Sequence, residues 1–113
     1  MRILVCGSRH FNNYELLEEK LNEIEITTII EGEAKGADRL GRRYGEERGI
    51  EVLRFPALWD KHGKAAGPIR NKQMLDEGRP ELVVAFRGPN SRGTQNMINQ
   101  ATKAGIPVTV IDI

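Results

Sequence analysis

The stretch Arg2–Cys6, RILVC, decides the fold of this chain, because it is a short, continuous apolar run that ends directly at Gly7. Similar runs recur along the sequence at Thr27–Ile30, Ile50–Phe55, Leu82–Phe86 and Val108–Ile111. Runs of this length without polar alternation are typical of strands that are covered on both faces, as in parallel sheets. The sequence therefore predicts five buried parallel strands.

Helical patterns fill the four intervals between these runs. Asn13 is the expected N-cap of the first helix, in which Leu17 and Leu21 fall at helical spacing. The other helices are expected from Ala37 to a stop at Gly49, from Pro68 to Glu77 with Gly78 as the stop, and from about Thr94 to a stop at Gly105. Strict alternation of strand and helix predicts an α/β three-layer sandwich with a five-stranded parallel sheet in the order 3-2-1-4-5.

Composition narrows the classes of function. The 113 residues suffice for one domain with its own core, and the net charge of +1 gives no general cationic field, which makes duplex DNA and anionic membranes unlikely partners. Cys6 is the only cysteine, so an intrachain disulfide and a multi-cysteine zinc site are excluded, and no metal or cofactor is expected. Without a signal-like N-terminus or an apolar run near about 18 residues, a cytoplasmic location is expected.

The unusual sequence falls at one predicted edge of the sheet. In open parallel sheets a ligand binds beyond the carboxyl ends of the strands, where the strand order reverses. The loops that meet there are Gly7–Asn13, Gly32–Ala37, Pro56–Gly67 and Arg87–Gly93. These loops and the adjoining helix starts are rich in basic residues, namely Arg9, Lys35, Lys61, Lys64, Arg70, Arg87 and Arg92. Glycines, helix N-termini and arginine forks together suit a phosphate group.

The segment from Phe55 to Met74 contains a strand-to-helix loop that is longer than such loops usually are. Pro68 is predicted to start a helix, which places Arg70 and Asn71 in the first helical turn, where free N–H groups favour an anion. Trp59 could stack on a base or anchor the loop by packing. Asp38 could be an N-cap, a ribose ligand or a catalytic acid.

Several motifs carry a family resemblance. They are Gly7-Ser8-Arg9 with Phe11, Gly32 with Lys35–Arg39, Phe55-Pro56-Ala57 with Trp59, Gly63–Asn71 with Met74, and Gly93-Thr94 after Ala85-Phe86. Together they closely resemble the YspA-like branch of the SLOG superfamily, which also includes the Smf/DprA single-strand DNA-binding proteins and the Lonely Guy phosphoribohydrolases. The resemblance covers essentially the whole chain. It implies a Rossmann-like fold and one nucleotide-binding domain over residues 1–113.

The phosphoribohydrolases carry a Pro-Gly-Gly-x-Gly-Thr-x-x-Glu motif, and this chain departs from it. Gly93-Thr94 matches the Gly-Thr pair, and Arg70 is a counterpart of the arginine that completes the site in those enzymes. The position of the catalytic glutamate falls on Met97, which cannot act as a base. Hydrolysis by that mechanism would need another carboxylate, for which Glu33, Asp38 and Asp60 are the nearby candidates. Asp38 and Glu33 are the expected catalytic residues in that case.

The leading hypothesis is a sensor or ligand-binding domain for a nucleotide or nucleotide-derived phosphate ligand, such as an ADP-ribose-like molecule or a nucleoside monophosphate, with a homodimer as a possible assembly. The expected ligand-binding residues are Gly7, Ser8, Arg9, Gly32, Lys35, Gly36, Asp38, Trp59, Lys64, Arg70, Asn71, Arg87, Gly88, Arg92, Gly93 and Thr94. One alternative is a phosphoribohydrolase-like N-glycosidase that acts on nucleotides. Another is a Smf/DprA-like single-strand nucleic-acid binder, which needs more stacking aromatics than Phe11 and Trp59 supply.

Overall fold

Five parallel strands form one sheet in the computed structural model, which describes residues 1 to 113. The strands are β1 (Arg2–Gly7), β2 (Thr28–Glu31), β3 (Glu51–Arg54), β4 (Leu82–Arg87) and β5 (Val108–Asp112). Their spatial order is β3-β2-β1-β4-β5, and every neighbouring pair is parallel. The predicted order 3-2-1-4-5 is therefore confirmed, and the strand order reverses between β1 and β4.

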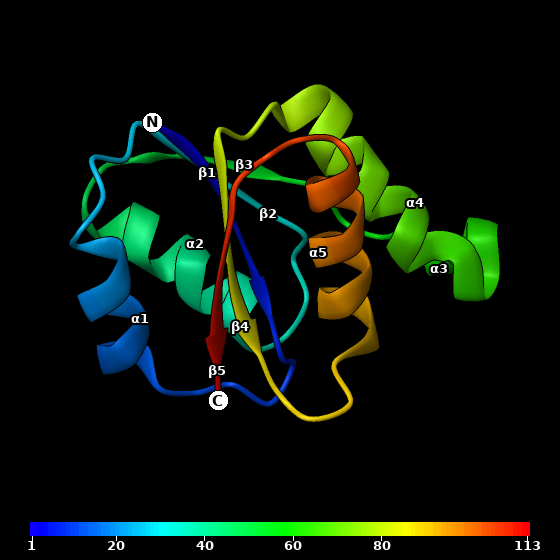
Figure 1. The fold of residues 1–113 in the computed structure, drawn as a ribbon, viewed down its shortest axis with the longest axis horizontal. Coiled ribbons are helices and arrows are strands. Elements are labelled where there is room, and N and C mark those ends of the chain that lie inside the picture. The colour runs from blue at the N-terminus through cyan, green and yellow to red at the C-terminus, as the bar shows by residue number, and fades with distance from the viewer.

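Helices cover both faces of the sheet and complete the three layers (Figure 1). On one face lie α1 (Tyr14–Leu21) and α2 (Ala37–Glu47), and on the other lie α4 (Ala66–Gln73) and α5 (Arg92–Lys103). Each face has its own buried apolar cluster. Side chains of β1 alternate between the two clusters, because Ile3 and Val5 belong to the cluster of α1 and α2 and Leu4 belongs to that of α4 and α5.

The edge strands are less buried than their apolar sequences predict. All four residues of β2 are buried, whereas no residue of β3 or β5 is. The expectation of strands covered on both faces is therefore right for β1, β2 and β4 and wrong for β3 and β5. The reason is geometric, because an edge strand has a neighbouring strand on one side only.

Three helix boundaries, in two helices, differ from the prediction. Helix α4 begins two residues before Pro68, which a helix tolerates because an N–H in the first turn has no intrahelical partner. It continues into a π-helical turn, η2 (Met74–Gly78), and the left-handed residue that ends it is Arg79, with φ of 51°, not Gly78. Helix α5 begins at Arg92, two residues before the predicted start near Thr94. The predicted N-cap Asn13 is confirmed, since its side chain accepts a hydrogen bond from the N–H of Leu16.

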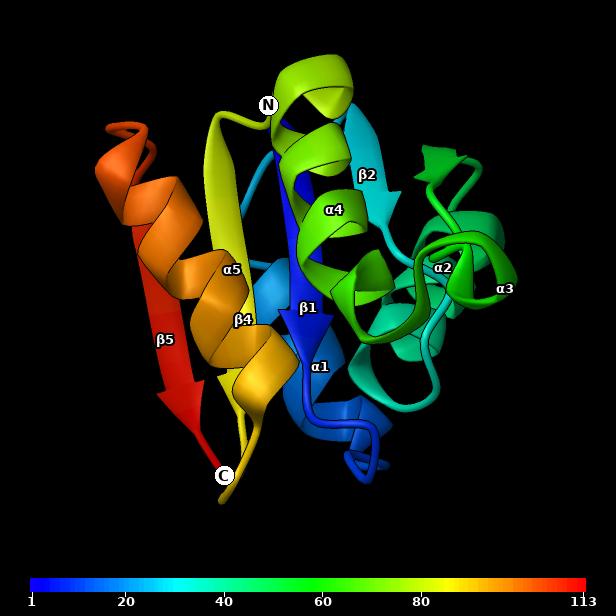
Figure 2. The same ribbon diagram turned by 90° about the vertical axis from the view of Figure 1, so that its right-hand side faces the viewer.

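The long connection between β3 and α4 is ordered by short helical turns. It contains α3 (Trp59–His62) and the 3₁₀ turn η1 (Gly63–Ala65) before α4 begins. Figures 1 and 2 both place α3 beyond α4, on the side away from α5. None of the helices is long and apolar enough to cross a membrane.

Candidate functional site

The loop after β1 is tied to the start of α2 at the point where the strand order reverses. The carbonyl of Ser8 accepts hydrogen bonds from the N–H groups of Phe11 and Ala37, both at 3.2 Å, and the N–H of Ser8 donates to the carbonyl of Phe86 at 2.9 Å. Gly36 has φ of 81°, and a Cβ there would collide with the Ser8 carbonyl oxygen. Gly36 is therefore required for this close approach of two loops.

The loop after β2 is filled by carboxylates of the protein itself. Asp38 Oδ2 accepts hydrogen bonds from the N–H groups of Gly32 (3.1 Å) and Ala34 (3.3 Å). Glu31 Oε1 accepts a hydrogen bond from the N–H of Glu33 at 2.7 Å. In other loops, consecutive N–H groups of this kind form a concavity that binds anions. Here the N–H groups of residues 32–34 already donate to carboxylates of the protein itself. Asp38 is not the N-cap of α2, since that position is held by Gly36.

Glu31 is the residue that the sequence analysis missed. Its side chain is fully buried, and Oε2 is the one buried side-chain polar atom without a hydrogen-bond partner. Burial raises the pKa of Glu31 to about 7 and the pKa of Asp38 to about 6, although Arg70 opposes the shift at Asp38. The signal in the sequence was a carboxylate that directly follows the predicted strand Thr27–Ile30.

Arg70 and Asn71 connect three segments of the chain. Arg70 Nη1 donates to the carbonyl of Gly32 at 2.5 Å, and Nε donates to Asn71 Oδ1 at 3.1 Å. Asn71 Nδ2 donates in turn to the carbonyl of Gly93 at 3.2 Å and to Asn96 Oδ1 at 3.1 Å. Both residues lie in the second turn of α4 and not in the first, because the helix starts at Ala66. Arg70 Nη2 forms no hydrogen bond, so the predicted role of Arg70 in ligand binding stays a prediction.

The start of α5 offers free backbone donors. The N–H groups of Gly93 and Thr94 have no acceptor in the protein, whereas the N–H groups of Arg92 and Gln95 donate to the carbonyls of Asn90 and Ser91. A small pocket of about 240 Å³ opens beside this turn, and we name it the Arg92 pocket. Its lining residues are Arg87, Gly88, Asn90, Ser91, Arg92 and Gln95.

The two arginines of the Arg92 pocket have different surroundings. The guanidinium of Arg87 donates to both carboxylate oxygens of Asp112, at 2.7 and 3.1 Å, and to Gln95 Oε1 at 3.0 Å. Arg92 is exposed and has no ion pair or side-chain hydrogen bond. Arg92 is therefore the available cation, and Arg87 braces the pocket wall.

The remaining predicted site residues are not brought together with α5. Trp59 lies on α3 with 58% of its surface exposed, and its ring reaches the start of α4, where a Cβ at Gly67 would lie 3.5 Å from Cη2. Lys64, in η1, shares this outlying position, while Arg9 and Lys35 are exposed on their loops. The carboxylate of Glu33 forms ion pairs with Arg42 at 3.4 Å and Arg54 at 3.9 Å. No group of three or more His, Cys, Asp or Glu side chains is arranged to hold a metal ion.

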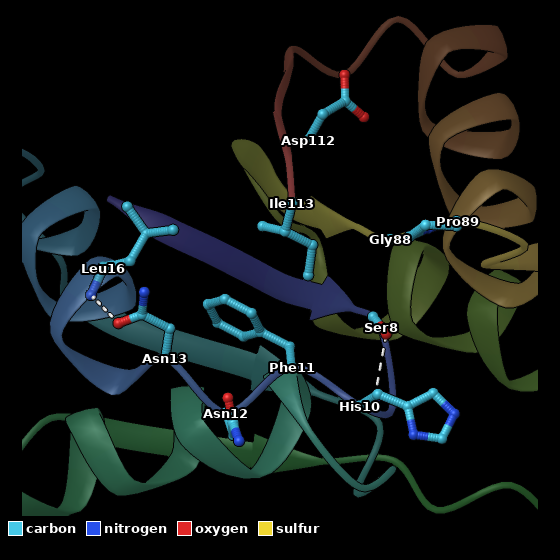
Figure 3. A pocket seen from close by; sticks show the side chains of 10 residues that line it. All are labelled: Ser8, His10, Phe11, Asn12, Asn13, Leu16, Gly88, Pro89, Asp112 and Ile113. Carbon is cyan, nitrogen blue, oxygen red and sulfur yellow. Dashed lines mark hydrogen bonds between the residues drawn. The ribbon is translucent and has the colours of Figure 1, made fainter.

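A larger pocket of about 470 Å³ lies between the loop after β1 and the end of β5 (Figure 3), and we name it the Phe11 pocket. Its lining residues are Ser8, His10, Phe11, Asn12, Asn13, Leu16, Gly88, Pro89, Asp112 and Ile113. The ring of Phe11 is 5% exposed and stacks on Phe86, with the ring centroids 4.8 Å apart. Phe11 is therefore part of the core and contributes little exposed surface to the pocket.

This chain is similar in sequence and in fold to known proteins. A model of the YspA, cpYpsA-related SLOG family matches residues 1–62. The Gene 61 protein of Mycobacterium phage D29 is 33% identical over 119 residues, which cover 95% of this chain and 93% of that protein. The X-ray structure of DNA processing protein A (DprA) from Streptococcus pneumoniae matches 96% of this chain with a TM-score of 0.76 and 20% identity. This chain spans 49% of the DprA chain, so the match demonstrates a shared fold over about half of that protein.

Proposed function

This chain belongs to the YspA, cpYpsA-related SLOG family, and on that premise we propose that it binds a nucleotide-type phosphate ligand at the carboxyl edge of its sheet. The phosphate would lie at the start of α5, in the Arg92 pocket. The proposal describes a sensor or ligand-binding domain, since binding alone is enough to report the concentration of a ligand.

The observation that carries this proposal is the unpaired guanidinium of Arg92, which lines the pocket. The pocket lies at the first turn of a twelve-residue helix, where the helix dipole favours an anion. The free N–H groups of Gly93 and Thr94 belong to the same turn but are not among the lining residues of the pocket. A volume of about 240 Å³ is below the range of about 300–1,000 Å³ that is usual for ligand pockets, so the Arg92 pocket suits a phosphate better than a whole nucleotide.

The loop after β2 is a poorer site for a phosphate, which favours the start of α5. The N–H groups of residues 32–34 already bind the carboxylates of Glu31 and Asp38, and a phosphate would have to displace them. A second anion next to these two carboxyl groups is unfavourable, because like charges repel at short range. The start of α5 therefore suits a phosphate better than the loop after β2, because no carboxylate of the protein occupies its N–H groups.

The two alternative functions have weaker support. Met97, at the position of the glutamate of the phosphoribohydrolases, is fully buried. Of the two replacement carboxylates, Asp38 is 4% exposed and holds backbone N–H groups, and Glu33 is paired with two arginines. The single-strand nucleic-acid alternative loses Phe11 as a stacking platform, because that ring is packed on Phe86.

The proposal is tested by thermal unfolding in the presence of inorganic phosphate, ribose 5-phosphate and the four nucleoside monophosphates. A ligand at 100 times its dissociation constant adds about 2.7 kcal/mol to the stability of the folded state, which is a readily measured increase in Tm. Arg92→Gln should weaken the binding of every phosphate probe, since it removes the free cation and leaves the helix intact. Lys103→Gln, at the other end of α5, is the matched control and should change nothing.

Two results would contradict the proposal. The first is the absence of any Tm increase with millimolar concentrations of the whole panel. The second is tight binding that Arg92→Gln leaves unaltered, which would place the phosphate elsewhere. Release of free base or phosphate, followed in the same samples by chromatography, would show that the protein is an enzyme and not only a binding domain.

A further inference from the structure

We propose that the Phe11 pocket binds the planar ring of the ligand, a nucleobase, while the phosphate of the same molecule occupies the Arg92 pocket. This inference rests on the proposed function and extends it, because it identifies the ligand class as nucleoside phosphates and not simple sugar phosphates. It also assigns residues on the α1 side of the sheet to ligand specificity.

The sizes of the two pockets divide a nucleotide into its two parts. The Phe11 pocket, at about 470 Å³, is within the usual range for small-molecule sites, whereas the Arg92 pocket, at about 240 Å³, is not. The linings of the two pockets also differ in polarity, as the base and the phosphate of a nucleotide do. Phe11, Leu16, Pro89 and Ile113 give the larger pocket its apolar surface, while the smaller pocket has no hydrophobic side chain in its lining.

The apolar groups of the Phe11 pocket are placed for contact with a flat ring. Figure 3 shows the side chain of Ile113 beside the ring of Phe11, with Leu16 on the other side of that ring and Gly88 and Pro89 across from it. Ile113 is 42% exposed, so covering it with a ligand removes apolar surface from water. The imidazole of His10 points away from Phe11 in the same view.

Polar atoms at the rim can read the edge of a base. The side-chain oxygen of Asn13 caps α1 by accepting from the N–H of Leu16, but its Nδ2 has no hydrogen-bond partner and can donate to a ring nitrogen or carbonyl. Ser8 Oγ accepts a hydrogen bond from the N–H of His10 and keeps its own hydroxyl proton for donation. The carboxylate of Asp112 is neutralised by Arg87, so this side chain adds little repulsion toward a phosphate ligand.

The two pockets are neighbours and share one lining residue, Gly88. Gly88 lies against Ser8, since a Cβ at position 88 would be 3.0 Å from Ser8 Cβ and 3.1 Å from Oγ. Residue 88 follows β4 and residue 8 follows β1, so this contact marks the crevice where the strand order reverses. A ligand with its phosphate in the Arg92 pocket and its ring beside Ile113 would pass Gly88, the one residue common to both linings.

The test compares ribose 5-phosphate with the four nucleoside monophosphates by isothermal titration calorimetry. At least one nucleotide should bind wild type about tenfold more tightly than ribose 5-phosphate, since burying part of a base and of Ile113 is worth about 1.4 kcal/mol. Ile113→Ser and Leu16→Ala should reduce this advantage by threefold or more, on the order of 0.7 kcal/mol, and leave the affinity for ribose 5-phosphate unaltered. Ile69→Ser removes an apolar side chain of similar exposure, 45%, from α4 and serves as the control.

Adenosine and the other nucleosides, which lack phosphate, provide a readout that is independent of the proposed phosphate site. In two-dimensional NMR spectra they should shift the backbone amide signals of Phe11, Asn13 and Ile113. Equal affinities of wild type for ribose 5-phosphate and all four nucleotides would overturn the inference, as would nucleoside-induced shifts confined to other residues. If no phosphate probe binds but a nucleoside shifts these three signals, the phosphate site is wrong and the base pocket stands.

Discussion

Replacing Glu31 with glutamine should change how the stability of this protein depends on pH. The fully buried carboxyl accepts one hydrogen bond at Oε1 and has an unpartnered Oε2, and burial raises its pKa from 4.5 to about 7. In the unfolded chain the same group loses its proton near its ordinary pKa. Between pH 4.5 and about 7 the folded state therefore binds more protons than the unfolded state, and the stability falls as the pH rises.

The size of the effect follows from the two pKa values. One pKa unit corresponds to about 1.4 kcal/mol, so ionising Glu31 in the folded protein costs on the order of 3 kcal/mol in total. Asp38 also lowers the stability of the protein as the pH rises, because burial raises its pKa from 3.8 to about 6. The part of this decrease that comes from Asp38 is largely complete by about pH 6. The interval from pH 6 to pH 8 therefore reports mainly on Glu31, with an expected loss of about 1 kcal/mol.

Urea unfolding at pH 5, 6, 7 and 8 measures this loss directly. Glu31→Gln keeps an acceptor for the N–H of Glu33 and cannot ionise, so its stability relative to wild type should increase by about 1 kcal/mol from pH 6 to pH 8 and by roughly 2 to 3 kcal/mol from pH 5 to pH 8. Glu19→Gln, on the exposed face of α1, is the control and should follow wild type. Parallel stability curves for wild type and Glu31→Gln, with equal m-values, would refute the argument.

Two further substitutions test the hydrogen bonds of the site. Arg70→Lys should lower the unfolding free energy by about 1 to 3 kcal/mol, because a lysine cannot donate to both the Gly32 carbonyl and Asn71 Oδ1; unaltered urea stability would mean that Arg70 serves only a ligand. Asp38→Asn should speed hydrogen exchange at the N–H groups of Gly32 and Ala34, since an amide oxygen is a weaker acceptor than a carboxylate; unaltered exchange at both would show that Asp38 does not hold this loop.

The loops show where prediction from sequence ends. The basic residues of all four carboxyl-edge loops were expected to form one cationic site, and the sheet order does bring the ends of β1 and β4 together. Trp59 and Lys64 nevertheless lie beyond α4, because the connection after β3 folds into α3 and η1 on the outer side of that helix. Arg87 was expected at the ligand, and its guanidinium is held by Asp112, which is 25 residues away in the sequence.

The sequence by itself determined the five strands, the four helices that cover the sheet and the topology of the sheet, but not the short turns α3, η1 and η2. This was possible because apolar periodicity and glycine or proline stops are local, and the handedness of parallel connections leaves few arrangements. Only the tertiary structure decided the state of the polar groups. Glu31 is buried and its Oε2 has no hydrogen-bond partner. Arg70 donates a hydrogen bond to the carbonyl of Gly32, which is 38 residues away in the sequence. Burial and hydrogen-bond partners arise when distant segments pack, so they lie beyond any local pattern.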